Sequence, residues 1–522
     1  MKKNCINICL PMCILTIFLW MFFFPGGAYT ADKYWTGSSG WWDDEINWSL
    51  TMGGPGGAGP PGDGDTGYLT VGSISSGTEN IGNLGNTIFF HTGGTNTVTN
   101  FVLGRNTTGN GTYNLSDTGT LLVNYEFPGN SNPYECIGYE GVGTFNHTGG
   151  INIATGVSLG TYSTSMGTYN LASGDLSADI EEIGRYNIGV FNHTGGTNTV
   201  TDFYLGGWFG TNDAGITGSN GTYNLGDVGI LTAENEYIGQ FDIGTFNQTG
   251  GTNTVTGTLT LAVNTGTSGT YNLLGGTLTA NSILNNDTFN YTGGSLTAEI
   301  INNGNINLTG RGIRILNGDV TNNWTFETTE TSAKFNGAFT NEDVFVSDSS
   351  TNYFTDLVIG VSGTMEGDEE DVWYVSGLLS GVETNEDFVT NIWGVDGMRV
   401  YYSLPGNEYL GGRTYELNVG GLLLPFSIQA VLDFFDGFVE HGALVGSGPG
   451  GSGANRLNPL RNKLEAASKL IGQGNYDGAC NKLEDVYSRC DGQPNPSDFA
   501  EGDATSCLAD MMLRLMENLG CY

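Results

Sequence analysis

One phrase recurs along the first half of this 522-residue chain, and it constrains the fold more than any other feature. Its first version reads FNHTGGTNTV, and its second reads GTYNL followed by a short Gly-rich turn. Both versions share one template: an aromatic residue, an Asn, a turn with Gly, and then alternating apolar and polar positions. The template Asn residues lie 18 to 32 residues apart, at Asn114, Asn146, Asn170, Asn192, Asn224, Asn247, Asn272 and Asn290.

A unit of this length predicts one coil of a β-solenoid. Coils stack about 4.8 Å apart, so the template aromatic residues should form a column and the Asn residues a ladder of side-chain hydrogen bonds. Pairs such as Leu159-Gly160 end many units, as expected where an inward aliphatic residue precedes a corner that needs φ values open to Gly. We therefore expect a mainly β fold, a right-handed β-solenoid (parallel β-helix). A β-sandwich array or a propeller with blades of about 50 residues is the alternative.

The chain divides into segments around these repeats. Lys2 and Lys3, an apolar run and Gly26-Gly27-Ala28 form a secretory signal pattern, so we expect a secreted or cell-surface protein with no membrane span after cleavage. The Gly/Ser-rich stretch before the tail is typical of a linker. The expected segments are a signal peptide at 1–28, a Trp-rich N-terminal cap at 29–72, regular coils at 73–310, irregular coils or a β cap at 311–445, a linker at 446–455 and a small α-helical domain at 456–522.

The charge balance excludes nucleic acid as an expected partner. The chain holds 54 acidic against 17 basic residues, a net charge of −37, whereas phosphate binding needs clustered cations. Clustered carboxylates suit Ca²⁺, the only cofactor that the sequence suggests, although solvated turns have the same composition. The candidate ligands are Asp63 and Asp65 in one turn, and Glu366, Asp368, Glu370 and Asp371 in another.

Other conspicuous side chains have structural interpretations. His91, His147 and His193 occupy one template position, but stacked two coils apart they would lie roughly 9–10 Å from one another, too far to share a metal ion. We therefore interpret them as outward or ladder residues. Basic residues within the repeats are limited to Arg105 and Arg185, so we expect no catalytic residues. Trp208 and Phe209, in an inserted loop, are candidates for contact with a glycan.

The Trp-rich opening, YWTGSSGWWDDEINW from Tyr34, and the FN-x-TGG and GTYNL units after it carry a family resemblance. Over roughly residues 34–380 the chain resembles the passenger-type repeats of secreted bacterial proteins, including autotransporter-like and PEP-CTERM-type proteins, without their barrel or sorting motif. The resemblance implies a secreted repeat architecture and no particular activity.

The tail, LNPLRNKLEAASKLIGQGNYDGACNKLEDVYSRCDG, resembles the FIMAH-like helical modules of exported bacterial proteins. Apolar residues spaced by three and four predict two amphipathic helices, and a third follows at about 504–519. Four cysteines in an oxidising compartment indicate two disulfides. If the second and third helices pack antiparallel, Cys490 pairs with Cys507 and Cys480 with Cys521.

These features favour an extracellular or cell-surface structural or adhesive scaffold that presents loops on a rigid β-solenoid. Its partners would be glycans, cell-surface or matrix proteins, or further copies of the chain. The alternative is a carbohydrate-active β-helix protein, either a polysaccharide lyase or a glycan-binding module, because right-handed β-helices often serve such enzymes.

Overall fold

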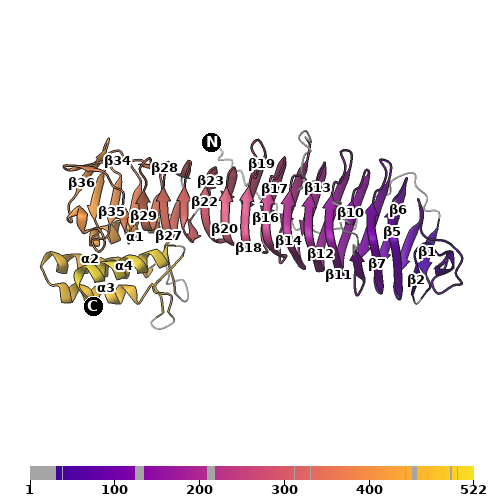
Figure 1. The fold of residues 1–522 in the computed structure, drawn as a ribbon. Helices are drawn as coiled ribbons and strands as arrows, with labels where there is room; N and C mark the ends of the chain where they lie inside the picture. Colours follow the sequence, from indigo (N-terminus) through magenta and orange to yellow (C-terminus); the bar gives the residue numbers. More distant parts are fainter. Residues whose placement is uncertain are drawn as a thin grey trace, which may run out of the picture.

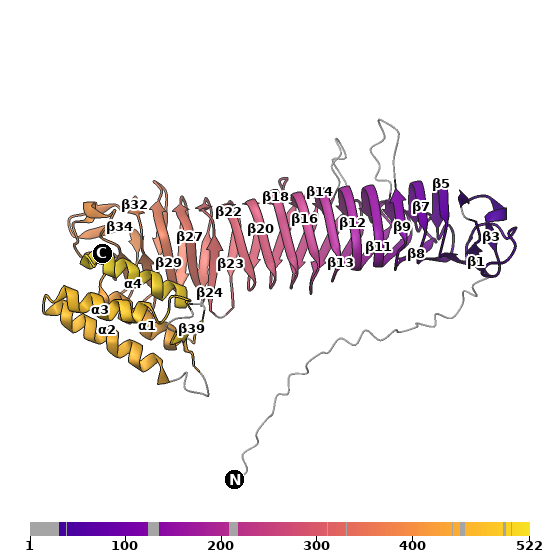
Figure 2. The ribbon, with the colours of Figure 1, turned by 90° about the horizontal axis from the view of Figure 1, so that it is seen from below.

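The computed structural model describes residues 31–521, except 38, 124–134, 208–217, 311, 330, 441, 449–454, 494–496 and 503. The expected signal peptide therefore lies outside the described residues. Parallel strands stack side by side into a long rod, and four helices lie against the side of its C-terminal part (Figures 1 and 2). The expectation of a mainly β fold with a small helical region is confirmed.

The strands form two rows, because each strand pairs in parallel with the strand that follows one turn of the chain later. Thus β4 (Thr66–Leu69) pairs with β6 (Asn86–His91), while β5 (Ser73–Ile81) pairs with β7 (Thr95–Leu103). We call one full turn of the chain, which contributes one segment to each row, a coil. In some coils the segment in the second row is divided into two strands, as in β9 and β10, which both pair with β7. The long strands β11 (Val142–Leu159) and β12 (Met166–Ile183) pass through both rows.

The first row also contains β1 (Asp32–Trp35), β8 (Asn110–Leu115), β13 (Ile188–His193), β15 (Asn220–Leu225), β17 (Ile243–Gln248), β19 (Ser268–Leu273), β21 (Thr288–Tyr291), β23 (Asn305–Leu308), β26 (Phe326–Thr329), β28 (Val344–Asp348), β30 (Thr364–Glu366), β34 (Phe388–Trp393) and β36 (Tyr415–Asn418). The second row also contains β2 (Ser39–Trp41), β9 (Thr120–Val123), β10 (Glu135–Ile137), β14 (Thr197–Leu205), β16 (Ile230–Ile238), β18 (Thr252–Leu261), β20 (Thr277–Asn285), β22 (Ser295–Asn302), β24 (Ile313–Asn317), β25 (Val320–Asn322), β27 (Ser332–Asn341), β29 (Thr351–Ile359), β31 (Val372–Val375), β32 (Leu379–Ser380), β35 (Arg399–Tyr402) and β37 (Leu422–Pro425).

The two versions of the repeated phrase occupy equivalent places in successive coils. Phe145 pairs with Tyr169 and Asn146 with Asn170 in register. The aromatic rings form a buried column with neighbouring centroids 4.6–5.4 Å apart, from Phe89 to Phe289. The template Asn side chains form a ladder from Asn114 to Asn307, in which each Nδ2 donates to the Oδ1 of the preceding coil at 2.7–2.9 Å. Both stacks agree with the sequence-based expectation.

The corner glycines allow the coils to approach closely. Gly160 has a φ of +69°, a conformation that suits Gly, and a Cβ there would lie 2.5 Å from the carbonyl oxygen of Ile188. Gly167, on the next coil, is constrained by space alone, because its Cβ would lie 2.1 Å from the carbonyl oxygen of Ile137. The high Gly content of the repeats is therefore explained by the close approach of backbones from neighbouring coils at the corners.

Each end of the rod is closed differently. At the N-terminal end, Trp42 and Trp48 pack on Phe89, the first ring of the column, and β3 (Trp48–Ser49) pairs antiparallel with β1. Segment 29–72, expected to be a Trp-rich N-terminal cap, also contains β1, β2 and β4, which pair in parallel like the other strands of the two rows. At the other end, β36 and β37 pair antiparallel with each other, which satisfies the outer backbone groups of the last coil.

The helices cover one side of the last coils. α1 (Ile428–Glu440) packs on tyrosines that point outward from the second row and are buried beneath it. Tyr374 donates to the Ala430 carbonyl at 3.3 Å, and Tyr401 to Asp433 at 2.8 Å. The other helices are α2 (Leu457–Gly472), α3 (Tyr476–Tyr487) and α4 (Thr505–Leu519). The helical region is therefore docked onto the rod, with an ion pair of 3.0 Å between Lys334 and Asp510.

Part of the expected linker is structured. β38 (Val445–Gly446) pairs antiparallel with β39 (Ala500–Glu501), so the first linker residue lies in a strand, while residues 449–454 lie outside the described residues. Residues 428–440, within the segment 311–445 that was expected to form irregular coils or a β cap, form the helix α1.

One of the two expected disulfides is present. Cys480 and Cys521 are bonded, with Cα atoms 5.6 Å apart. Cys490 and Cys507 are buried free thiols, so the expected bond between them is absent. The Cys490 thiol, in the turn after α3, donates to the carbonyl of Val486, whereas Cys507 faces Lys334 of the rod. The error came from placing helix ends next to each other without knowing that α4 would face the rod.

We expect the Cys480–Cys521 disulfide to stabilise the helical region. It closes a loop with a sequence separation of 41, and removing a bond of this kind costs typically about 2–4 kcal/mol. In a Cys480→Ser/Cys521→Ser variant, the helical circular dichroism signal should be lost at a lower guanidinium concentration than in the parent. A Cys490→Ser variant serves as a control, since that thiol forms no disulfide. Equal shifts in both variants would contradict the assignment.

Candidate functional site

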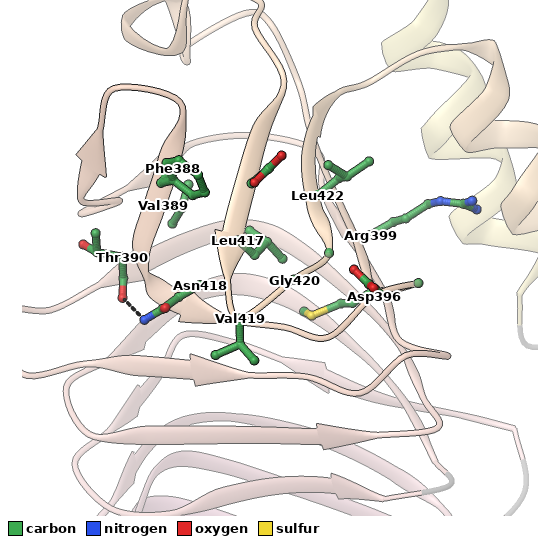
Figure 3. Close-up of a pocket in the computed structure, with 14 residues that line it drawn as sticks. Phe388, Val389, Thr390, Asp396, Arg399, Leu417, Asn418, Val419, Gly420 and Leu422 are labelled. Carbon is green, nitrogen blue, oxygen red and sulfur yellow. Dashed lines mark hydrogen bonds between the residues drawn. The ribbon is translucent and has the colours of Figure 1, made fainter.

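An open hollow of about 710 Å³ lies at the C-terminal end of the rod (Figure 3). It is formed by β34, by the start of β35, and by the turn between β36 and β37. The lining residues are Phe388, Val389, Thr390, Asp396, Gly397, Met398, Arg399, Glu416, Leu417, Asn418, Val419, Gly420, Gly421 and Leu422. Its volume falls in the range typical of small-molecule sites.

The rim of the hollow exposes apolar side chains. Phe388 is 50 % exposed, Val419 72 % and Leu422 37 %. Val419 has a φ of +80°, which is strained for a β-branched residue and places its side chain at the tip of the β36–β37 turn. Such strain persists only where the surroundings impose it, and here the following two glycines and the antiparallel pairing hold the turn.

Polar residues also line the hollow, although the Arg399 side chain runs away from it toward the helices (Figure 3). Asn418 donates to the Thr390 carbonyl at 3.2 Å and so joins β34 to β36. Arg399 forms an ion pair of 3.4 Å with Asp433 of α1, which ties one wall to the helical region. Asp396 and Glu416 add carboxylates. An aromatic ring beside carboxylates and an amide is a combination that can bind a hydroxyl-rich ring such as a sugar.

Four of the six candidate Ca²⁺ ligands accept hydrogen bonds from backbone amides, Asp368 from that of Glu369. Asp63 accepts from the Leu84 amide at 3.0 Å, and Asp65 from that of Gly62 at 3.0 Å. Asp371 is fully buried and accepts from the amides of Ser350 at 2.8 Å and Asp368 at 2.7 Å, and burial raises its pKa to about 6. Among the described residues, no three His, Cys, Asp or Glu side chains form a group suited to a metal ion. Both turns therefore have a structural explanation, and Ca²⁺ binding, including by Glu366 and Glu370, stays a prediction.

The three template histidines point inward. His91, His147 and His193 are fully buried, which corrects the outward alternative, and burial lowers their pKa to about 4. In each, Nε2 lies 3.1–3.3 Å from a Gly carbonyl and Nδ1 lies 2.7–2.9 Å from a Tyr hydroxyl of the next coil. They are neutral connectors between coils.

The two basic residues of the repeats have acceptor or acidic partners. Arg105 donates to Asn80 at 2.9 Å, and Arg185 lies 3.3 Å from Glu182 with both side chains 2 % exposed, so both basic residues of the repeats are engaged. Trp208 and Phe209, the candidate glycan contacts, lie outside the described residues.

Sequence reasoning missed the hollow. Its residues belong to the irregular segment after the repeats, where no template marks equivalent positions. The Asn418-Val419-Gly420-Gly421 turn was the available signal, but a turn does not reveal what its tip faces.

Comparison with protein-family profiles, curated proteins and solved structures gave no match. Within the described part of the chain, no helix is both long and apolar enough to cross a membrane. Function is therefore inferred from the geometry.

Proposed function

We propose that this chain is a secreted or cell-surface scaffold, a right-handed β-solenoid that holds its loops and its C-terminal hollow away from the cell for adhesion or assembly. The observation that carries the proposal is the in-register stack of rings and amides along the rod. Right-handedness is supported by the strong preference for right-handed crossover connections between parallel strands of one sheet.

The distribution of chemistry also favours a scaffold. The histidines and several carboxylates with strongly shifted pKa values lie in the buried interior, where they bind neighbouring coils and not a substrate. A catalytic pair of carboxylates would face a groove that substrate can enter.

A direct experiment separates scaffold from lyase. Purified chain lacking residues 1–28 is incubated with acidic and neutral polysaccharides, with and without Ca²⁺, and intact producing cells are labelled with an antibody to the rod. We expect surface labelling and no cleavage product. Cleavage that disappears in a Glu416→Gln variant, or labelling only after cell lysis, would contradict the proposal.

Glycan binding at the hollow is the second candidate function, and the half-exposed Phe388 beside Glu416 favours it. Stacking of a sugar on this ring would be lost in Phe388→Ala. The control is Phe241→Ala, which removes a comparably exposed ring (43 %) far along the chain. Binding lost equally in both variants, or in neither, would exclude the hollow as the glycan site.

A further inference from the structure

Four buried glutamates occupy equivalent places inside the rod. Glu79, Glu135, Glu181 and Glu236 are each fully buried and point inward from the second row. In register they alternate with apolar residues of the intervening coils, in the order Glu79, Phe101, Glu135, Val157, Glu181, Phe203, Glu236 and Leu259. The carboxyls are thus two coils apart, roughly 9–10 Å.

Each glutamate is paired with an Asn 17 residues later, on the next coil. The Asn Nδ2 donates to the carboxyl at 3.0–3.2 Å in all four pairs: Asn96 to Glu79, Asn152 to Glu135, Asn198 to Glu181 and Asn253 to Glu236. The same Nδ2 lies 3.2–3.4 Å from the hydroxyl of Tyr113, Tyr169, Tyr223 or Tyr271, respectively, one coil further on. Each network therefore spans three coils.

The direction of the hydrogen bonds can be assigned. In three networks the His Nε2 faces a carbonyl, which only accepts, so Nε2 carries the hydrogen and Nδ1 accepts from Tyr. The fourth network has Gln248 in the His position: its Oε1 accepts from Tyr271 at 2.6 Å and its Nε2 donates to the Thr277 carbonyl at 2.9 Å. Since Gln performs the same role without a charge, the position requires a neutral donor and acceptor.

One hydrogen is then missing from each network. The Oδ1 atoms of Asn96, Asn152, Asn198 and Asn253 are buried without a hydrogen-bond partner, as are the Oε1 atoms of Glu79, Glu181 and Glu236. Both kinds of orphan are acceptors if the carboxyl is ionised, and buried acceptors left unpaired are costly. A protonated carboxyl supplies the missing donor to the unpaired Asn Oδ1.

We propose that Glu79, Glu135, Glu181 and Glu236 are carboxylic acids in the folded rod, each donating its hydrogen to the Oδ1 of its partner Asn, and that loss of these protons at alkaline pH loosens the rod. The pairs form a row of buried acid–amide links along the interior. The row gives the scaffold a stability that depends on pH.

The electrostatic surroundings agree with this proposal. Burial raises the pKa of each of the four glutamates from 4.5 to about 8, against the smaller opposite effect of the Asn bond. The ionisable groups that act on them are acidic: Asp43 acts on Glu79, and Glu181 acts on Glu135 and Glu236. The facing phenols of Tyr113, Tyr169, Tyr223 and Tyr271 have pKa values raised well above 10 by burial. The histidines beside them are neutral above about pH 4.

The sign of the pH effect follows from linkage. A carboxyl whose folded pKa lies above its unfolded pKa stabilises the fold fully below pH 4.5, and that stabilisation is lost as the pH rises through about 8. Between these values, each such glutamate releases close to one proton on unfolding. Each one lowers the folding equilibrium constant about tenfold per pH unit there.

Glu236 offers the sharpest test because its network contains no histidine. We compare the parent with Glu236→Gln, whose amide can replace the acid as donor to Asn253, and with Glu234→Gln, an exposed control two residues earlier on β16. Protons released on unfolding in guanidinium are measured at pH 6.5 with an indicator dye. We expect about one proton fewer from Glu236→Gln than from the parent. Glu234→Gln should release the same number of protons as the parent, because Glu234 is exposed.

The infrared carbonyl band of buried protonated carboxylic acids in the folded parent gives a second readout that does not depend on a variant folding. We expect the band at pH 6.5 and its disappearance on unfolding. Absence of the band, or equal proton release by the parent and Glu236→Gln, would overturn the proposal.

Discussion

Replacing Phe191 with Ala should lower the free energy of unfolding by about 3–5 kcal/mol, the cost of removing a fully buried ring from a packed core. Phe191 is completely buried, and its ring lies 4.7 Å from those of Tyr169 and Tyr223, between centroids. The neighbouring rings cannot close the gap, because their coils are held in register by backbone pairing and by the Asn ladder on either side.

The matched control is Phe241→Ala, which removes the same atoms from a side chain that is 43 % exposed and should change stability by less than about 1 kcal/mol. Guanidinium unfolding followed by tryptophan fluorescence measures both variants. Similar small shifts for the two would mean that the column does not support the fold. Phe191→Leu, which fills more of the space, should fall between them.

The column and the ladder could be predicted from sequence because each depends on one residue type at one repeated position. When coils stack in register, equal positions meet, and Phe145 must meet Tyr169 whatever the rest of the fold does. The corner glycines follow by the same logic. Position in a repeat therefore predicts neighbours reliably.

The direction of a side chain was harder to predict, as the histidines show. The sequence left His147 as either an outward or a ladder residue, and it is buried, with Nδ1 2.9 Å from the Tyr169 hydroxyl of the next coil. The available signal was the constant separation of 17 residues from each buried Glu to its Asn, as in Glu181 and Asn198. That signal is meaningful only when both residues are known to face inward.

The hollow and the docking of the helices could not be predicted, because both depend on contacts between segments without a shared period. Tyr374 and Tyr401 alternate like solvent-facing strand residues, but α1 covers them. Cys507 was paired wrongly for the same reason, since its side of α4 faces Lys334 of the rod.

The inward-facing side chains repeat every two coils, although the backbone repeats every coil. Two kinds of coil alternate at three inward positions. One kind carries His, or Gln at 248, then Asn and an apolar residue, and the other carries two aliphatic residues and then Glu. His147, Asn152 and Val157 pair in register with Leu171, Leu176 and Glu181, respectively. Each polar network needs a coil of one kind between two of the other. Removing two successive coils should thus preserve every remaining network, whereas removing one should break two of them.

The chain allows both deletions at matched sites, because Met166 pairs with Ile188 and Ile188 pairs with Asn220. Deleting residues 167–188 removes one coil and stacks His147 and Asn152 against His193 and Asn198, without Tyr169 and Glu181. Deleting residues 167–220 removes two coils and brings Tyr223 into the place of Tyr169. The first deletion leaves several buried polar groups unpaired, each costing about 1–3 kcal/mol. The second shortens the rod by roughly 10 Å.

Thermal unfolding of these two deletion variants beside the parent, followed by circular dichroism of the β signal, tests most directly whether alternating coil chemistry builds this rod. The longer deletion should unfold close to the parent midpoint, while the shorter deletion, although it removes fewer residues, should unfold at a much lower temperature or fail to fold. Equal midpoints for the two deletions, or a more stable one-coil deletion, would contradict the account.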